Sequence, residues 1–341
     1  MKKSLLALAV LTAISGAASA QSSVTLYGKV DLGLVYDAGG AHGKSIRVSS
    51  GVTGGSRIGF KGVEDLGGGL KASFQLETGF CADSAAGAPN FCTGSNNFMG
   101  RQAYGALSGA FGQLSAGRQY SLGFVNLTTI DPFGTGFAGQ INNIFDASGI
   151  RLNNSVTYTT PVMSGFSVAG EIALGEQTGN WEAGRETGAA LTYATGPIYA
   201  GATFYSVNNA VGETADKVWQ VGGTYDFGVV KLHGMVQETK SADTLSIGVP
   251  HDRLNLMGGV TVPLAGGSVM FDYVHSNDKE VLDQDAQQWG AGYLYPLSKR
   301  TSMYVAYAWI NNRQLANFTV GNATDTGTGN KAFNLGVVHN F

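Results

Sequence analysis

Residues 24–36 read Val-Thr-Leu-Tyr-Gly-Lys-Val-Asp-Leu-Gly-Leu-Val-Tyr, with apolar residues at most of the even positions. The odd positions include Thr25, Lys29 and Asp31, so apolar and polar side chains alternate. Because successive side chains of a β-strand point to opposite faces, this period of two predicts a strand with one apolar and one polar face. The same alternation returns in residues 333–341 and in several segments between, which predicts an all-β fold.

Residues 1–20 have the layout of a cleavable secretory signal. Lys2 and Lys3 precede an apolar run over residues 5–14, and the small residues Ala-Ser-Ala end the segment. The run is shorter than the ~18 residues that a membrane-spanning helix needs, which disfavours a retained anchor. We therefore expect export, with residues 21–341 as the mature chain.

Charge and composition narrow the function classes. Without the two lysines of the signal, 24 acidic residues face 19 basic ones, and this acidic balance gives no indication of a nucleic-acid partner. The 51 Gly and 7 Pro are spread without a linker-like shift, which favours a single domain over residues 21–341. No later segment has the unbroken apolar length of a spanning helix, so only strands could cross a bilayer. Such strands must close into a barrel, because lipid offers backbone amides no hydrogen-bond partner.

The connections separate a transmembrane antiparallel β-barrel from a soluble β-sandwich, which would show the same alternation with its apolar face buried. Short links alternate with long polar stretches, as in outer-membrane barrels with short periplasmic turns and long external loops. The short links are Glu64–Gly69, Thr160–Gly165, Val262–Gly267 and Pro296–Arg300. Together with the export signal and the terminal Phe341, this asymmetry favours the barrel. At about 20 residues per strand with its connections, the mature chain holds roughly sixteen strands around an aqueous lumen.

An ordered set of short motifs runs along the whole mature chain: Leu26–Lys29, Ser56–Gly62, Glu64–Gly67, Arg101–Tyr104, Phe111–Gly112, Gly117–Arg118, Arg151–Tyr158 and the terminal Phe341. Together these motifs resemble the Gram-negative general porins, especially those of β-proteobacteria such as Neisseria and Burkholderia relatives. The resemblance implies a sixteen-stranded barrel in the outer membrane of a Gram-negative bacterium, assembled as a homotrimer, with the third long loop folded inward.

The same resemblance implies a function and partners. Small hydrophilic solutes and inorganic ions would diffuse passively through the lumen, and the barrel would contact outer-membrane lipid and lipopolysaccharide. The terminal Phe341 resembles the signal that the barrel-assembly machinery reads, although an aromatic residue there also suits the membrane interface.

Basic side chains are expected along one wall of a pore constriction. The resemblance places Lys29, Arg57, Arg101 and Arg151 there, and Lys61 shares the strand parity of Arg57. Lys29 and Arg57 lie on the polar parity of their strands, so they should point into the lumen. An Arg facing lipid at the bilayer midplane would cost about 2–4 kcal/mol, which supports an inward direction. Alternatively, these side chains are solvated surface charges, or they form ion pairs that only hold the wall together.

The constriction loop is expected at about residues 119–150. Its segment Asp131-Pro132-Phe133-Gly134 resembles the tip of the porin constriction loop, but the acidic residue that follows Pro in the family is absent. Asp131 and Asp146 remain as candidate acidic groups opposite the basic wall, and either could instead be a turn or cap residue. So few acids would leave a positive field that favours anions.

Cys81 and Cys92 lie in one long loop of an exported chain, where oxidation is favoured, so we expect a disulfide between them. Closing a loop of that length would stabilise the fold by roughly 3 kcal/mol. A metal site is disfavoured because no His or further Cys lies nearby.

No enzyme or cofactor signature is present. The five His lack the His-Glu-x-x-His spacing, and no Gly-x-Ser-x-Gly nucleophile motif occurs. Residues 134–139 match Gly-x-Gly-x-x-Gly but lack the β-α-β context of a dinucleotide site. We therefore expect a passive channel without catalysis, cofactor or metal. The alternatives are a substrate-specific channel, a non-conducting barrel that acts as an adhesin, and a soluble exported sandwich.

Overall fold

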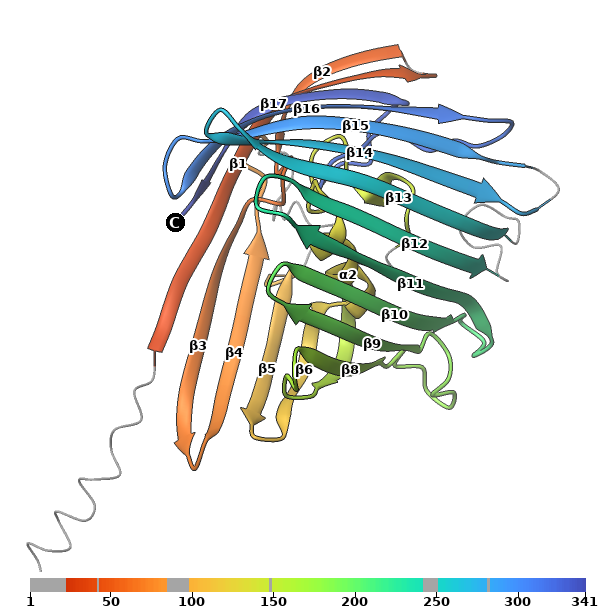
Figure 1. Ribbon diagram of the computed structural model, residues 1–341. Coiled ribbons are helices and arrows are strands. Elements are labelled where there is room, and N and C mark those ends of the chain that lie inside the picture. Colours follow the sequence, from red (N-terminus) through yellow and green to blue (C-terminus); the bar gives the residue numbers. More distant parts are fainter. Residues whose placement is uncertain (1–22, 42, 85–97, 147–148, 242–250, 281–282) are drawn as a thin grey trace, which may run out of the picture.

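The computed structural model describes residues 23–41, 43–84, 98–146, 149–241, 251–280 and 283–341. Most of the described chain is strand, and the strands follow one another around a barrel (Figure 1). The strands are β1 Ser23–Gly40, β2 Gly43–Ser50, β3 Arg57–Gly67, β4 Leu70–Gly79, β5 Gln102–Gly109, β6 Gly112–Tyr120, β7 Arg151–Thr159, β8 Phe166–Ala173, β9 Glu186–Thr195, β10 Ile198–Asn208, β11 Thr214–Asp226, β12 Lys231–Ser241, β13 His251–Leu264, β14 Gly267–Asp278, β15 Ala286–Pro296, β16 Thr301–Asn312 and β17 Lys331–Asn340. Two short helices, α2 Leu122–Ile130 and η1 Ile141–Asn143, lie between β6 and β7.

The barrel is antiparallel throughout, and β1 closes it by pairing with β17 over residues 29–38. β2 and β3 share one position in the sheet, because β2 pairs with the second half of β1 and β3 with its first half, residues 23–29. The seventeen strand segments of the described chain therefore form a closed sixteen-stranded barrel. The prediction of about sixteen antiparallel strands is confirmed.

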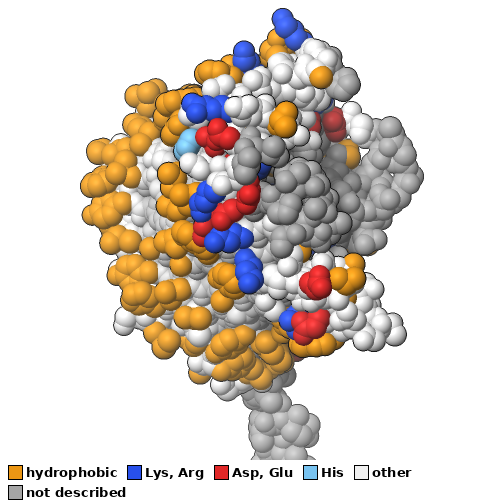
Figure 2. All heavy atoms as spheres, turned by 90° about the vertical axis from the view of Figure 1, so that its right-hand side faces the viewer, with side chains coloured by type: hydrophobic (Ala, Val, Ile, Leu, Met, Phe, Trp, Pro, Cys, Tyr) orange, Lys and Arg blue, Asp and Glu red, His pale blue; other side chains and the backbone are white. Residues whose placement is uncertain are grey.

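The distribution of apolar and polar side chains over the two faces of the sheet is the reverse of that in a soluble protein. Large apolar side chains such as Leu26, Val221 and Trp289 are exposed on the outside, whereas Gln237 and Asn334 on the inner face are fully buried. In Figure 2 hydrophobic side chains cover the left flank of the molecule, while Lys, Arg, Asp and Glu gather nearer the centre of that view. A sandwich would bury its apolar face, so the alternation predicted from sequence belongs to a membrane barrel.

Connections differ between the two rims. Two-residue turns at 68–69, 110–111, 196–197 and 265–266 join hairpins on one rim. Gly68 has a φ of +61°, a left-handed conformation that glycine adopts at no steric cost. The other rim carries the long connections, which include residues 80–101, 121–150 and 313–330. This asymmetry confirms the predicted pattern of short turns and long loops.

Residues 121–150 fold back into the barrel, where α2 lies inside the ring of strands (Figure 1). The hydroxyl oxygen of Ser121 caps α2 by accepting a hydrogen bond from the Phe124 N–H at 3.2 Å. Leu127 and Ile130 of α2 are fully buried in an apolar cluster with the inner wall. The wall residues of this cluster are Met235, Met257, Val274, Ala286, Ala308, Ile310 and Ala332. The predicted inward fold of the third long loop is confirmed.

Two predictions fall on residues outside the described part of the chain. The signal, residues 1–20, is one of them. Cys92 is the other, so the pairing of Cys81 with Cys92 stays a prediction.

Candidate functional site

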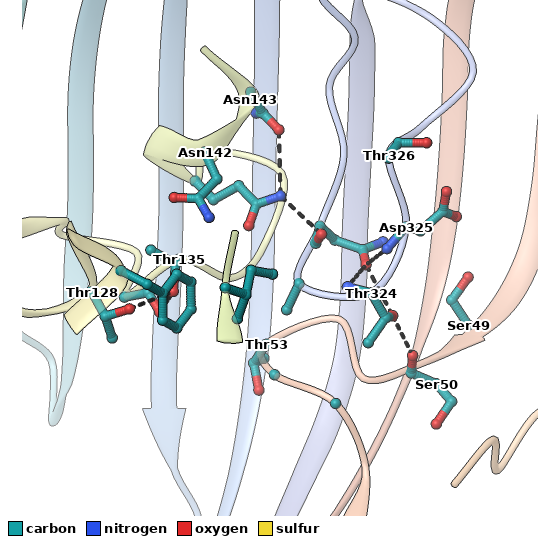
Figure 3. Close-up of a pocket in the computed structure, with 18 of the residues that line it drawn as sticks. Ser49, Ser50, Thr53, Thr128, Thr135, Asn142, Asn143, Thr324, Asp325 and Thr326 are labelled. Atoms are coloured by element: carbon teal, nitrogen blue, oxygen red, sulfur yellow. Dashed lines mark hydrogen bonds between the residues drawn. The ribbon is translucent and has the colours of Figure 1, made fainter. Parts of the chain in front are cut away.

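A cavity of about 1250 Å³ lies inside the barrel, between the wall, the loop 121–150 and the segment 313–330. Polar side chains from all three surround it, among them Ser49, Thr135 and Thr324 (Figure 3). Its charged lining consists of five basic and two acidic side chains. These are Lys29, Arg47, Arg57, Arg101 and Arg151, with Asp83 and Asp325.

An inward bend at residues 51–56 separates β2 from β3 and contacts the side chain of Lys29 on β1. Gly51 has a φ of +80°, which lets the chain leave the sheet. Thr53 fixes the bend, because its N–H and hydroxyl donate to the Asp31 carboxylate at 2.6 and 2.8 Å. The Lys29 ammonium donates to the Thr53 hydroxyl at 3.4 Å. The bend therefore holds one basic group at the edge of the cavity.

A buried carboxylate organises the next two basic groups. Glu77 of β4 is 3 % exposed, and its Oε1 accepts from Arg101 Nε at 2.6 Å. Its Oε2 lies 3.4 Å from Arg57 Nε and accepts from the Tyr27 hydroxyl at 3.0 Å. Such a pair is tolerated in a low-dielectric wall because the carboxylate oxygens are hydrogen-bonded. One negative charge thus holds two guanidiniums, and the local balance stays positive.

Tyr120, the last residue of β6, holds the other side of the basic wall. Its hydroxyl oxygen accepts from Arg101 Nη2 at 2.8 Å and from Arg151 Nη2 at 3.0 Å. The Arg151 guanidinium carbon lies 4.6 Å from the centre of the Tyr120 ring, within cation–π range. Phe124 of α2 stacks on the same ring at 5.2 Å. Sequence reasoning missed Tyr120, because its role depends on two arginines that are distant in the chain.

The predicted basic residues divide into two groups. Four of them line the same cavity: Lys29, Arg57, Arg101 and Arg151. Lys61 is not among the lining residues. It is exposed on β3, with its ammonium 5.5 Å from the centre of the Tyr27 ring.

Asp131 faces the backbone of its own loop. Its carboxylate accepts from the N–H groups of Phe133, Thr135 and Ile141 at 3.0, 2.8 and 3.2 Å. Burial raises the pKa of this carboxyl group to about 6, against the three hydrogen bonds that lower it. Of the two roles open from the sequence, this geometry fits the anchor within the loop.

The residues after Asp131 pack against glycines of the wall. A Cβ placed on Gly259 would lie 2.6 Å from Pro132 Cγ, and one on Gly292 would lie 2.9 Å from Phe133 Cε1. The bare backbone at these two positions lets the loop tip approach the sheet closely. Gly134, next along the chain, lines the cavity.

Asp146 fixes the end of the loop through its backbone. Its carbonyl oxygen accepts from Gln237 Nε2 at 2.6 Å, from Gln220 Nε2 at 3.1 Å and from the Tyr205 hydroxyl at 3.1 Å. Its N–H donates to Gln237 Oε1 at 2.9 Å. Inward-facing glutamines therefore tie this part of the loop to β11 and β12.

The segment 313–330 is a second inward fold, which sequence reasoning missed. Gln140 Nε2 donates to the Asn322 carbonyl oxygen at 2.8 Å, and the Gly321 N–H donates to Asn143 Oδ1 at 3.0 Å. Figure 3 shows the loop at Asn143 beside the segment at Thr324 and Asp325, with hydrogen bonds between the two. Its Asn, Thr, Asp and Gly residues indicated only a polar connection.

Arg47 was also missed, although its position could have been found. It lies between the exposed Ile46 and Val48 on β2, and that alternation predicts an inward side chain. Its guanidinium donates to the carboxylates of Asp37 and Asp325, so two acids meet one base.

A closed barrel with an apolar exterior and a charged, water-accessible interior is a transmembrane channel. A family model described as Gram-negative porin matches residues 7–315. "Outer membrane porin protein 32" of Delftia acidovorans is 38% identical over 330 residues, covering 92% of this chain and 90% of the relative. An outer membrane porin protein of Bordetella pertussis is 32% identical over 371 residues, covering 92% and 95%.

Among solved structures, an "Anion-selective porin from Comamonas acidovorans" superimposes with a TM-score of 0.79 at 32% identity, covering 94% of this chain and 100% of that one. This chain belongs to the Gram-negative porin family and is an outer-membrane channel protein. The resemblance inferred from the motifs is thereby confirmed. Within the described residues, no group of three or more His, Cys, Asp or Glu side chains is placed to hold a metal ion.

Proposed function

We propose that the chain forms a homotrimeric channel in which a basic constriction makes passive diffusion favour anions over cations. The observation that carries this proposal is the charge of the cavity lining, where five basic side chains face two acidic ones. Glu77 does not line the cavity, but it pairs with Arg57 and Arg101 and offsets one of their two positive charges, so the group of Arg57, Arg101 and Arg151 keeps a net positive charge. A permeating ion therefore meets more positive than negative charge.

The basic wall acts on ions by electrostatics and hydrogen bonding alone. Guanidinium N–H groups replace part of the hydration shell of an anion, and charge-assisted hydrogen bonds of this kind are stronger than neutral ones. Tyr120 holds Arg101 and Arg151 in fixed directions, so their remaining N–H groups are pre-oriented. The flux needs no cofactor, energy source or covalent step.

Two further facts support parts of the proposal. A solved relative that covers 94% of this chain carries the words anion-selective in its name. Membership of the porin family supports the trimer, and light scattering of the detergent-solubilised protein should give three copies per particle.

The test is the reversal potential of the purified protein in a planar bilayer under a salt gradient. Stepwise conductance in groups of three, with a reversal potential of the sign set by anion flow, is the expected result. A cation-directed potential would overturn the selectivity, and a folded protein without conductance would overturn the channel. Flux that saturates with one class of solute would instead indicate a substrate-specific channel.

A further inference from the structure

The loop 121–150 gives the constriction little negative charge. Of its two acidic residues, Asp131 directs its carboxylate at three backbone N–H groups, and neither Asp131 nor Asp146 is part of the cavity lining. The acids that do line the cavity come from other segments, Asp83 after β4 and Asp325 before β17. The negative side of the constriction therefore has to be sought outside the constriction loop.

Asp325 is placed to supply it. The Asp325 side chain is 31% exposed, whereas Asp37, the other partner of Arg47, is 1% exposed. Arg47 thus lies between a carboxylate buried in the wall and one that faces the water of the lumen. Two negative charges against one positive charge give this triad a net charge of about −1 when all three groups are ionised. Arg47 accordingly adds no net positive charge to the lumen.

We infer that Asp325 is the acidic counter-charge of the constriction and limits the anion preference that the remaining basic residues create. This inference rests on the proposed function and adds a selectivity-determining residue to it. Neutralising Asp325 would leave Arg47 balanced by Asp37 alone, and the charge met by a permeating ion would rise by one unit.

The segment that carries Asp325 has anchors of its own. The Thr324 hydroxyl donates to the Ser50 carbonyl oxygen at 2.7 Å, as Figure 3 shows, and the Ala323 N–H donates to the Val52 carbonyl oxygen at 3.3 Å. The hydrogen bonds from the loop 121–150 to Gly321 and Asn322 add two more contacts. A neutral side chain at position 325 should therefore change the charge of the lumen without releasing the segment.

The experiment compares reversal potentials and single-channel conductances of the full-length wild type and Asp325→Asn. We expect the anion-to-cation permeability ratio of D325N to rise about twofold. One charge about 10 Å from the ion path, screened by about 0.1 M salt, raises the local anion concentration and lowers the local cation concentration by a combined factor of about two. Conductance should stay near the wild-type value. Arg47→Gln should shift the ratio in the opposite direction, because it leaves two acids without their base.

Three further variants separate charge from structure. Asp325→Glu keeps the charge and should keep the wild-type ratio. Thr324→Val removes an anchor without a charge change and should also keep it; a rise like that of D325N would assign the effect to loop displacement and overturn the inference. Glu64→Gln makes the same charge change at an exposed position outside the cavity lining and should have no effect.

The outcomes for the two proposals differ. A D325N ratio equal to that of the wild type overturns the inference while leaving an anion-preferring channel intact. A wild-type channel without anion preference overturns the proposed function, and a D325N shift toward anions from that baseline would still support the counter-charge.

Discussion

The two sides of the barrel lumen are built from different chemistry. The side formed by β1 to β7 carries basic side chains that line the cavity, including Arg57, Arg101 and Arg151. The side formed by β12 to β16 presents Met235 and Val274, and the loop 121–150 covers it. The loop lies over the side where apolar contact offsets the cost of ordering it, and the basic side chains lie on the side that borders the cavity.

The glutamines of the covered side explain how a loop can stay inside a wet lumen. Gln288 Nε2 donates to the carbonyl oxygens of Gly139 and Gln140 at 3.1 and 3.3 Å. Together with Gln220 and Gln237, it satisfies backbone groups that would otherwise be buried without partners. The uncharged side therefore positions the constriction, and under the proposed function the charged side sets its selectivity.

Removal of the charged side should give the largest effect. In the triple variant Arg57→Gln, Arg101→Gln and Arg151→Gln, three positive charges are lost, and we expect the anion-to-cation permeability ratio to fall about eightfold, at about twofold per charge. The reversal potential under a salt gradient measures it. Lys61→Gln removes a basic charge outside the cavity lining and serves as the control. Retained anion preference in the triple variant would contradict the role of the wall.

A substitution that loosens the packing of the uncharged side should lower the stability of the protein more than it changes the ion selectivity. Leu127 of α2 is fully buried, and Leu127→Ala should weaken the packing of the loop by about 2–5 kcal/mol. We expect a lower unfolding temperature and noisier single-channel currents. Val125→Ala on the same helix is the matched control, because Val125 is 46% exposed. Equal effects of the two substitutions would show that the burial of Leu127 does not hold the loop.

A small change on the charged side should give the smallest effect. A Cβ on Gly55 would lie 2.7 Å from Arg101 Nη1, so Gly55→Ala should push the guanidinium aside. We expect a reduced conductance with the direction of selectivity unchanged, measured in single-channel recordings. Gly170→Ala, where a Cβ would meet nothing within 4 Å, should behave as wild type. An unchanged conductance in G55A would contradict the expected displacement of the Arg101 guanidinium, and so would an equal change in the G170A control.

Much of this arrangement could be predicted from the sequence, because strand alternation is a local property. The parity of Lys29 and Arg57 gave their inward direction, and the contrast of short and long connections gave the barrel. The position of the segment 313–330 could not be predicted, since it depends on hydrogen bonds to Gln140 and Asn143 that lie far away in the chain. The sequence likewise left open whether Asp131 is an acidic group opposite the basic wall or an anchor within its loop. Only the fold of the loop separates the two roles.

The meeting of β1 and β17 has a consequence for the order of folding. Lys29 pairs with Asn340, and the Gly28 N–H donates to the Phe341 carbonyl oxygen at 3.0 Å. Joining strands so far apart in the chain costs about 4–5 kcal/mol more loop-closure entropy than joining a two-residue hairpin. Contacts of such long range form slowly, so we expect this seam to form last and to be a poor folding nucleus. The half-built sheet exposes two unpaired edges until then, and its lifetime sets how long the chain needs protection from aggregation.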